Sequence, residues 1–205
     1  MTTVSYVVNI DVKKMYLPKL AKISPFDAMV YYETEKTRFR IISRATGEEV
    51  GRKYHVPAFF TFHFTNCFES NGNIIIDLCK ADGNIIRSLT HANINKADSD
   101  PTKLSANVKP VRYVLPVDGL DDKPVNEELL KDVPEAKISN GDIIACASAV
   151  KQPNGDIFAK ELIQADMTTE LPRINYKYNM KPYSYFYACK VSDPEIEKVN
   201  FDSLV

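Results

Sequence analysis

Two dipeptides, Asn71-Gly72 and Asp82-Gly83, strongly restrict how the chain around them can fold. Both central positions of a type I′ hairpin turn need positive φ, which Asn, Asp and Gly tolerate better than other residues. Apolar or alternating runs lie beside these turns, at residues 59–67, 74–79 and 85–89. We therefore expect a three-stranded antiparallel meander that has His63 on its first strand.

The rest of the chain is also β-rich. Further strands are expected within residues 1–10, 28–32, 38–42, 111–116, 143–150, 157–162, 183–188 and 198–205. Those from 111 to 162 are expected to form a second meander, whose last two strands are joined by Pro153-Asn154-Gly155. No stretch has a clear helical period, and residues 126–131 are the best candidate for a short helix.

Small sheets that repeat along the chain favour an all-β fold built from propeller blades over a sandwich. The long polar links at 93–107 and 118–140 are interpreted as surface excursions. The strands expected at the two ends have no partner in the predicted sheets, and exposed edges are avoided in closed β architectures. We therefore expect residues 1–205 to form the central portion of a larger propeller, incomplete at both ends.

Composition excludes several classes of protein. The 205 residues are 44% hydrophobic and carry a net charge of -1, so no basic surface indicates a nucleic-acid partner. No apolar run is long enough for a transmembrane helix, and the first residues lack the features of a signal peptide. The four cysteines are widely spaced, which is typical of reduced thiols in an intracellular protein. A cytoplasmic location is expected.

His63 is the residue with the most chemical potential. On a regular strand Phe60, Phe62 and Phe64 would form one apolar face, with His63 projecting from the other. An imidazole on a rigid strand is a common arrangement for a metal ligand and also for an ordinary buried histidine. Spacing alone leaves both interpretations open.

Glu170 precedes a Leu171-Pro172 step. Proline favours an extended backbone in the residue before it, so this carboxylate would be held in a fixed direction. Glu170 is then either a solvated loop residue or an acceptor for the ring N–H of a metal-bound histidine.

Several motifs in order resemble one family. They are the run from Phe62 to Glu69, the apolar strand that ends in Asp77-Leu78-Cys79, and the segments Val111 to Pro116, Glu170 to Tyr176 and Met180 to Tyr183. Together they resemble the carotenoid cleavage oxygenases, which include the animal β-carotene oxygenases and the retinoid isomerohydrolase of the visual cycle. The resemblance covers nearly the whole chain.

The resemblance implies a seven-bladed β-propeller, of which this chain would supply about three blades. It also implies a non-haem Fe(II) held by four histidines, where O₂ cleaves a double bond of a carotenoid. His63 is similar to the third iron ligand and Glu170 to the glutamate that orients it. The two are therefore expected to approach within about 2.6 to 3.2 Å. Asn66 and Glu69 are interpreted as structural, shaping the end of the strand.

The chain also departs from the family pattern. Phe64 stands where animal members often have a second histidine, and Met180 stands where they have glycine. The other two histidines, His55 and His91, match no ligand position, so three iron ligands would have to lie outside the chain. The chain alone is expected to be inactive, and no catalytic or substrate-binding residue is assigned.

Two other functions remain open. One is the isomerohydrolase branch, which acts on retinyl esters, and the other is a metal-free binding module derived from a propeller. The expected partners are O₂ and a carotenoid or retinoid, which are lipid-soluble. Residues 12–20 mix apolar side chains with lysines, a composition that suits either peripheral contact with a membrane or a solvated loop.

Overall fold

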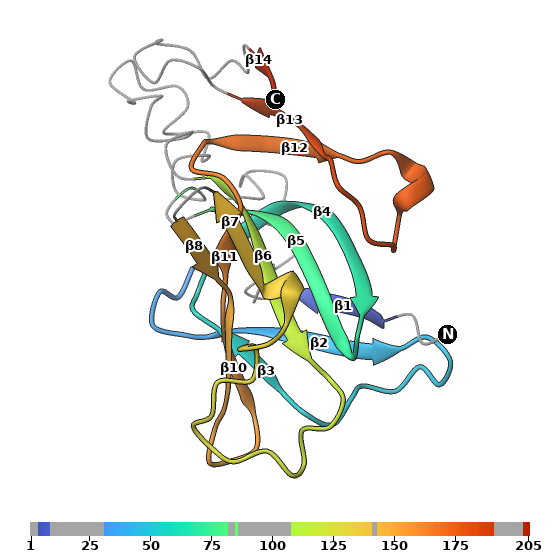
Figure 1. Ribbon diagram of the computed structural model, residues 1–205, viewed down its shortest axis with the longest axis vertical. Coiled ribbons are helices and arrows are strands. Elements are labelled where there is room, and N and C mark those ends of the chain that lie inside the picture. The colour runs from blue at the N-terminus through green and yellow to red at the C-terminus, as the bar shows by residue number, and fades with distance from the viewer. Residues whose placement is uncertain (1–3, 9–30, 82–84, 86–107, 141–142, 191–202) are drawn as a thin grey trace, which may run out of the picture.

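The computed structural model describes residues 4–8, 31–81, 85, 108–140, 143–190 and 203–205, and its regular structure there is almost entirely β (Figure 1). The strands are β1 (Val4–Val8), β2 (Thr37–Ser43), β3 (Tyr54–Val56), β4 (Phe60–Ser70), β5 (Asn73–Ala81), β6 (Lys109–Pro116), β7 (Lys137–Asn140), β8 (Ile143–Cys146), β9 (Ser148–Lys151), β10 (Ile157–Lys160), β11 (Leu162–Ile163), β12 (Thr169–Arg173), β13 (Tyr187–Lys190) and β14 (Ser203–Leu204). Within the described ranges, the short 3₁₀ turns η3 (Pro134–Ala136) and η4 (Tyr176–Tyr178) interrupt the strands. The predicted all-β class is confirmed.

A four-stranded antiparallel sheet carries the predicted hairpin. Its order is β11-β6-β5-β4, and the turn between β4 and β5 has φ values of 48° at Asn71 and 74° at Gly72. The prediction of a third strand at 85–89 is wrong for Ile85, which lies outside any strand. Instead β6 pairs along β5 from Asn73↔Pro116 to Lys80↔Lys109, because its apolar residues complete the buried sheet.

A five-stranded sheet joins distant parts of the chain. Its order is β1-β2-β3-β10-β9, and the pairing of β3 with β10 is parallel. The predicted second meander is therefore wrong, because β6 belongs to the other sheet. The expected strand at 143–150 is divided at Ala147 into β8 and β9. The N–H of Ala147 donates to Ala136 O at this point. Gly155 has φ of 84°, as the predicted turn between β9 and β10 requires.

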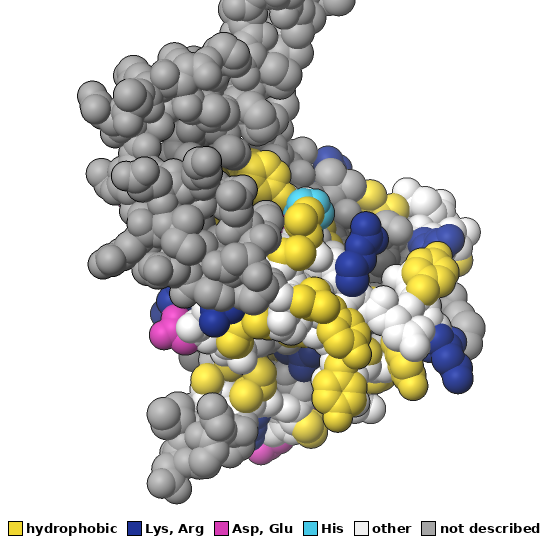
Figure 2. Space-filling model, turned by 90° about the horizontal axis from the view of Figure 1, so that it is seen from above, with side chains coloured by type: hydrophobic (Ala, Val, Ile, Leu, Met, Phe, Trp, Pro, Cys, Tyr) yellow, Lys and Arg dark blue, Asp and Glu magenta, His cyan; other side chains and the backbone are white. Residues whose placement is uncertain are grey.

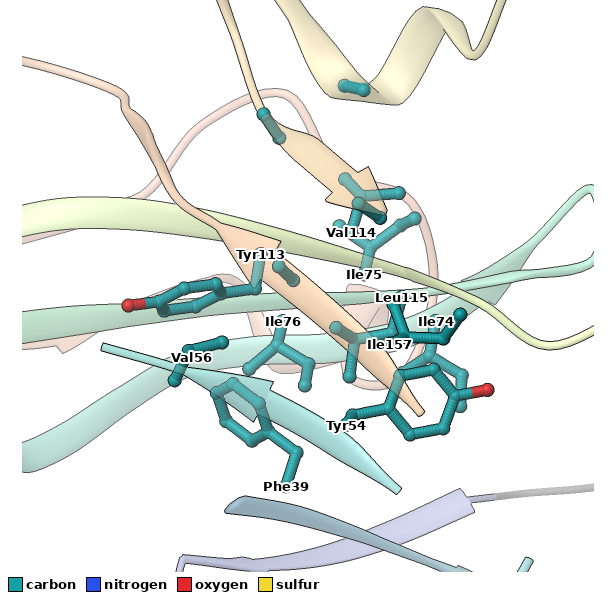
Figure 3. Packing of buried hydrophobic residues seen from close by; sticks show 14 of the residues in the cluster. Phe39, Tyr54, Val56, Ile74, Ile75, Ile76, Tyr113, Val114, Leu115 and Ile157 are labelled. Atoms are coloured by element: carbon teal, nitrogen blue, oxygen red, sulfur yellow. The ribbon is translucent and has the colours of Figure 1, made fainter. Parts of the chain in front are cut away.

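The hydrophobic core lies between these two sheets (Figure 3). Phe39 and Tyr54 enter it from the five-stranded sheet, and Ile76 and Tyr113 enter it from the four-stranded sheet. The Phe39 and Tyr113 ring centroids lie 5.2 Å apart, and the Tyr54 hydroxyl donates to Pro116 O at 2.7 Å. β5 is buried at nearly every position, as expected for a strand covered on both faces.

The third sheet, β12-β13-β14, lies at the top of Figure 1. Its edge strand β12 contacts β4, which is an edge strand of the four-stranded sheet. Two edges from neighbouring sheets thus meet, and this meeting brings residues 60–70 beside residues 169–173.

The polar link 118–140 differs from its predicted form. Asn126 has φ of 62° and Glu128 forms a bridge with Val150, so the expected helix at 126–131 is wrong. Leu120 and Leu130 are buried in the core, so this link is more than a surface excursion. The terminal strands have partners, since β1 pairs with β2 and β14 with β13.

Some sequence predictions lie outside the described residues. These are the Asp82-Gly83 turn, His91, the link 93–107, the mixed apolar and basic segment 12–20, and parts of the strands expected at 1–10, 28–32, 85–89 and 198–205. Within the residues that are described, no helix has the length and apolar character needed to cross a membrane.

Candidate metal-ligand site

Two bulges in β4 determine the direction of His63. β4 advances three residues from Thr61 to Phe64 while β5 advances two from Lys80 to Leu78, and a second shift lies between Phe64 and Asn66. Each bulge inserts an extra residue, bends its strand and re-aims side chains. The His63 side chain is 46% exposed as a result.

The predicted alternation of faces in this strand is therefore wrong. Phe62 is 39% exposed, whereas Thr61 and Thr65 are buried. Phe60 and Phe62 still contact each other edge to face, with ring centroids 4.6 Å apart. Figure 2 shows a face of the molecule on which a histidine lies among hydrophobic side chains.

Glu170 on β12 faces His63 on β4, the edge strand of the neighbouring sheet. Oε2 of Glu170 lies 2.7 Å from Nδ1 of His63, so the predicted contact between residues 107 positions apart is confirmed. The same oxygen accepts the N–H of Leu171 at 2.9 Å. Leu171 has φ of 56°, so the extended backbone expected before Pro172 is wrong, and a left-handed residue with a local hydrogen bond fixes the carboxylate instead.

The surroundings of Glu170 are buried. Its other oxygen, Oε1, has no hydrogen-bond partner among the described residues. Cys79 is fully buried on β5, and its thiol pKa is raised to about 12, first by burial and then by the negative charge of Glu170. Glu170 thus has one oxygen engaged by His63 and a protected environment behind it.

The donor chemistry of His63 fits that of a single metal ligand. With Nδ1 engaged by a carboxylate, the remaining ring nitrogen, Nε2, is the one that can offer a lone pair to a metal. No group of three or more His, Cys, Asp or Glu side chains able to hold a metal occurs in the described part of the chain. His55 lies instead near Asp156, with Nε2 3.4 Å from Oδ2.

The sequence predicts that Asn66 shapes the end of the strand, whereas in the structure it lies within β4 and binds a distant segment. Its Oδ1 accepts the N–H groups of Cys67 and Met180, and its Nδ2 donates to the carbonyl oxygens of Tyr178 and Lys181, all at 2.9 to 3.2 Å. Asparagine offers this combination of donors and acceptors, and the sequence signal for it is an asparagine inside a predicted strand.

Asp77 is a second polar residue whose role the sequence did not indicate. It is fully buried and receives two 2.7 Å hydrogen bonds from Arg112 and a third, also of 2.7 Å, from the Tyr183 hydroxyl. An acidic residue in an otherwise apolar strand is the sequence signal for such a buried pair.

The whole chain is similar to one family of proteins. The model of the family described as RPE65, retinal pigment epithelial membrane protein, matches residues 1–205. The mouse beta,beta-carotene 15,15'-dioxygenase is 28% identical over 185 residues, covering 89% of this chain and 31% of that protein. The human mitochondrial carotenoid-cleaving dioxygenase is 32% identical over 164 residues, covering 75% of this chain and 27% of that protein. The chain thus spans 27% to 31% of the length of these two relatives.

Solved structures show the same fold. A chimera of ACO and RPE65 covers 99% of this chain with a TM-score of 0.54 at 15% identity, and the chain covers 33% of it. A lignostilbene dioxygenase from Pseudomonas brassicacearum covers 95% of this chain with a TM-score of 0.53 at 14% identity, and the chain covers 31% of it. This likeness confirms the predicted partial propeller.

Proposed function

This chain belongs to the RPE65 family of retinal pigment epithelial membrane protein and carotenoid oxygenases. On that premise we propose that it supplies one of the four histidines that bind iron in a carotenoid-cleaving dioxygenase. Relatives named as carotenoid dioxygenases support carotenoid cleavage at the level of the family. The observation that carries the assignment to a residue is the 2.7 Å contact between His63 Nδ1 and Glu170 Oε2.

The two residues act together in this proposal. The carboxylate of Glu170 holds the proton on Nδ1 of His63, which keeps the lone pair on Nε2 and fixes the orientation of the ring. The Leu171 N–H holds the carboxylate in place, so the ring does not need to be ordered when the metal binds. Fe(II), when bound by neutral imidazoles, would supply an open position for O₂ beside an apolar polyene. The other imidazoles would come from parts of the protein beyond the described residues.

The test compares three variants of the protein expressed from its natural transcript. Glu170→Gln is expected to keep the fold and weaken iron binding about ten- to a hundred-fold, and His63→Ala is expected to abolish it. Glu161→Gln is the matched control, because Glu161 is also a partly buried carboxylate but lies next to β11, at the opposite edge of the sheet. Iron content, circular dichroism and β-carotene cleavage are measured for each.

The products separate the candidate functions. Retinal or longer apocarotenals from β-carotene support cleavage, whereas isomerised retinol from a retinyl ester places the protein in the isomerohydrolase branch. A folded protein with no iron and neither product would be a metal-free binding module. Stoichiometric iron and unchanged turnover in His63→Ala would overturn the assignment of His63 as a ligand.

A further inference from the structure

Asn66 and Asp77 are direct neighbours across β4 and β5, and both bind the segment between β12 and β13. We propose that this pair, the Asn66–Asp77 clamp, positions Glu170 against His63 by fixing residues 176–183 onto the four-stranded sheet. The proposal rests on the proposed function, because it concerns the same pair of side chains. Asn66 and Asp77 bind neither metal nor substrate, and they act as positioning residues.

The first half of the clamp is Asn66. Its side-chain amide makes two donor and two acceptor hydrogen bonds, three of them to residues 178–181. Met180, one of these partners, has φ of 59°, a conformation that a non-glycine residue adopts only at an energetic cost. The amide therefore holds the segment in a conformation that it would not keep by itself.

The second half is Asp77. Its carboxylate is fully buried and is held from one side by both ends of the Arg112 fork and from the other by the Tyr183 hydroxyl. Tyr183 also contacts the Phe68 ring of β4 edge to face, with centroids 6.2 Å apart. Charge-assisted hydrogen bonds of this kind are strong and direction-specific, so the position of Tyr183 is closely defined.

The position of the clamp explains why the site needs it. The two bulges interrupt the regular pairing of β4 with β5 around His63, so this part of the strand lacks the support of a continuous ladder. Asn66 is the first residue after the bulges that pairs again, opposite Asp77. The clamp thus joins the restored part of β4 to the segment that follows Glu170, and it sets the separation of β4 from β12.

The first experiment reads the tautomer of His63 in the metal-free protein by ¹⁵N NMR of the imidazole, at a pH of about 8.5 where ordinary histidines are neutral. The His63 signals are assigned by their loss in His63→Ala. The parent protein should show Nδ1 protonated and Nε2 unprotonated. Asn66→Ala should lose this preference, whereas Asn73→Ala should retain it.

Asn73 is the matched control because it is buried in the same sheet to nearly the same degree, but among the described residues its side chain donates to the nearby Asn71 carbonyl and not to residues 178–181. If Asn66→Ala does not fold, Tyr183→Phe removes one hydroxyl from the other half of the clamp and should weaken the same preference. A parent-like tautomer in a folded Asn66→Ala or in Tyr183→Phe, or an equal change in Asn73→Ala, would overturn the proposal.

The second experiment is a double-mutant cycle on iron affinity. If Asn66 acts through Glu170, Asn66→Ala should weaken iron binding by up to the ten- to hundred-fold effect of Glu170→Gln, and the double variant should lose no more than Glu170→Gln alone. Independent, multiplying effects would contradict the clamp. The tautomer is read without metal, so the two proposals can fail separately. If the tautomer of His63 depends on Asn66 but His63→Ala retains the parent iron content, the proposed function is rejected and the clamp remains supported.

Discussion

The Tyr183 hydroxyl donates a 2.7 Å hydrogen bond to Oδ2 of Asp77, joining the segment before β13 to the centre of β5 over 106 positions. The pKa of Tyr183 is raised, first by burial and then by the Asp77 charge, so the phenol remains a donor at alkaline pH values where an exposed tyrosine ionises. Tyr183→Phe keeps the ring but leaves a buried carboxylate with one bond fewer.

We expect Tyr183→Phe to lower the free energy of unfolding by about 1.5 to 3 kcal/mol, measured by urea denaturation. Tyr185→Phe is the control, because Tyr185 is 79% exposed and its loss should change stability by less than about 0.5 kcal/mol. Equal effects of the two substitutions would show that the buried hydrogen bond contributes nothing.

Gly72 combines a left-handed backbone with a close neighbour. Its φ is 74°, and a Cβ added there would lie 3.1 Å from Oδ2 and 3.2 Å from Cβ of Asp118. Gly155 has φ of 84°, but beyond its chain neighbours no atom of the described residues lies within 4 Å of the same position, so it separates the two effects. Gly155→Ala should cost about 1 to 2 kcal/mol of unfolding free energy from the backbone alone, and Gly72→Ala should cost more. Thermal and urea denaturation of both variants measure the difference, and a smaller cost at Gly72 would show that Asp118 moves aside freely.

Met180 occupies a left-handed conformation, with φ of 59°, which glycine adopts without a steric penalty. Met180→Gly should raise the free energy of unfolding by about 0.5 to 1 kcal/mol, because removal of the strain exceeds the added flexibility of the unfolded chain. Lys177→Gly, in the neighbouring η4 turn, is the control and should give no gain. Urea denaturation detects a change of this size, and destabilisation by Met180→Gly would show that the methionine side chain contributes more than its backbone costs.

A buried thiol and two buried phenols stay protonated in the folded protein at alkaline pH values where the same groups ionise in the unfolded chain. Burial raises the pKa of Cys79 to about 12 and raises the pKa values of Tyr54 and Tyr113 as well. Between about pH 9 and pH 12 the unfolded state therefore binds fewer protons, and stability falls as pH rises, by about 1.4 kcal/mol per pH unit for each such group. Below about pH 8 these groups are protonated in both states and contribute no slope.

Urea denaturation at about pH 8 and about pH 10.5 tests this alkaline loss of stability. Cys79→Ala should reduce the slope by the share of one group. Cys146→Ala is the control, because Cys146 is exposed and should leave the slope unchanged. A slope that does not respond to Cys79→Ala would mean that the thiol ionises as readily in the folded protein as in the unfolded chain.

Local chemistry determined which parts of the fold could be predicted. The turn at Asn71-Gly72 depends on two residues with positive φ, and it was predicted correctly. The partner of β5 was not, because β6 begins 28 positions after β5 ends and the pairing depends on the burial of both strands. The two bulges in β4 have no sequence signal, so regular alternation gave the wrong faces for Phe62 and Thr61.

The candidate site was also predictable only in part, because local sequence patterns do not determine contacts between distant segments. The contact between His63 and Glu170 followed from the resemblance, which carries long-range information that spacing does not. The roles of Asn66 and Asp77 depend on where residues 176–183 lie in space, and no local pattern places that segment.

The parallel pairing of β3 with β10 has a consequence for the order of synthesis and folding. Ile157 pairs with Tyr54, so the ribosome must add about a hundred residues after β3 before its second neighbour exists. During that interval one edge of β3 offers unpaired N–H and C=O groups, which are a template for pairing with other chains. Pairings of such large sequence separation also slow folding, because a long loop must close before the contact forms. The nascent chain is therefore exposed to aggregation until β10 emerges, and that period is when a chaperone would protect it most.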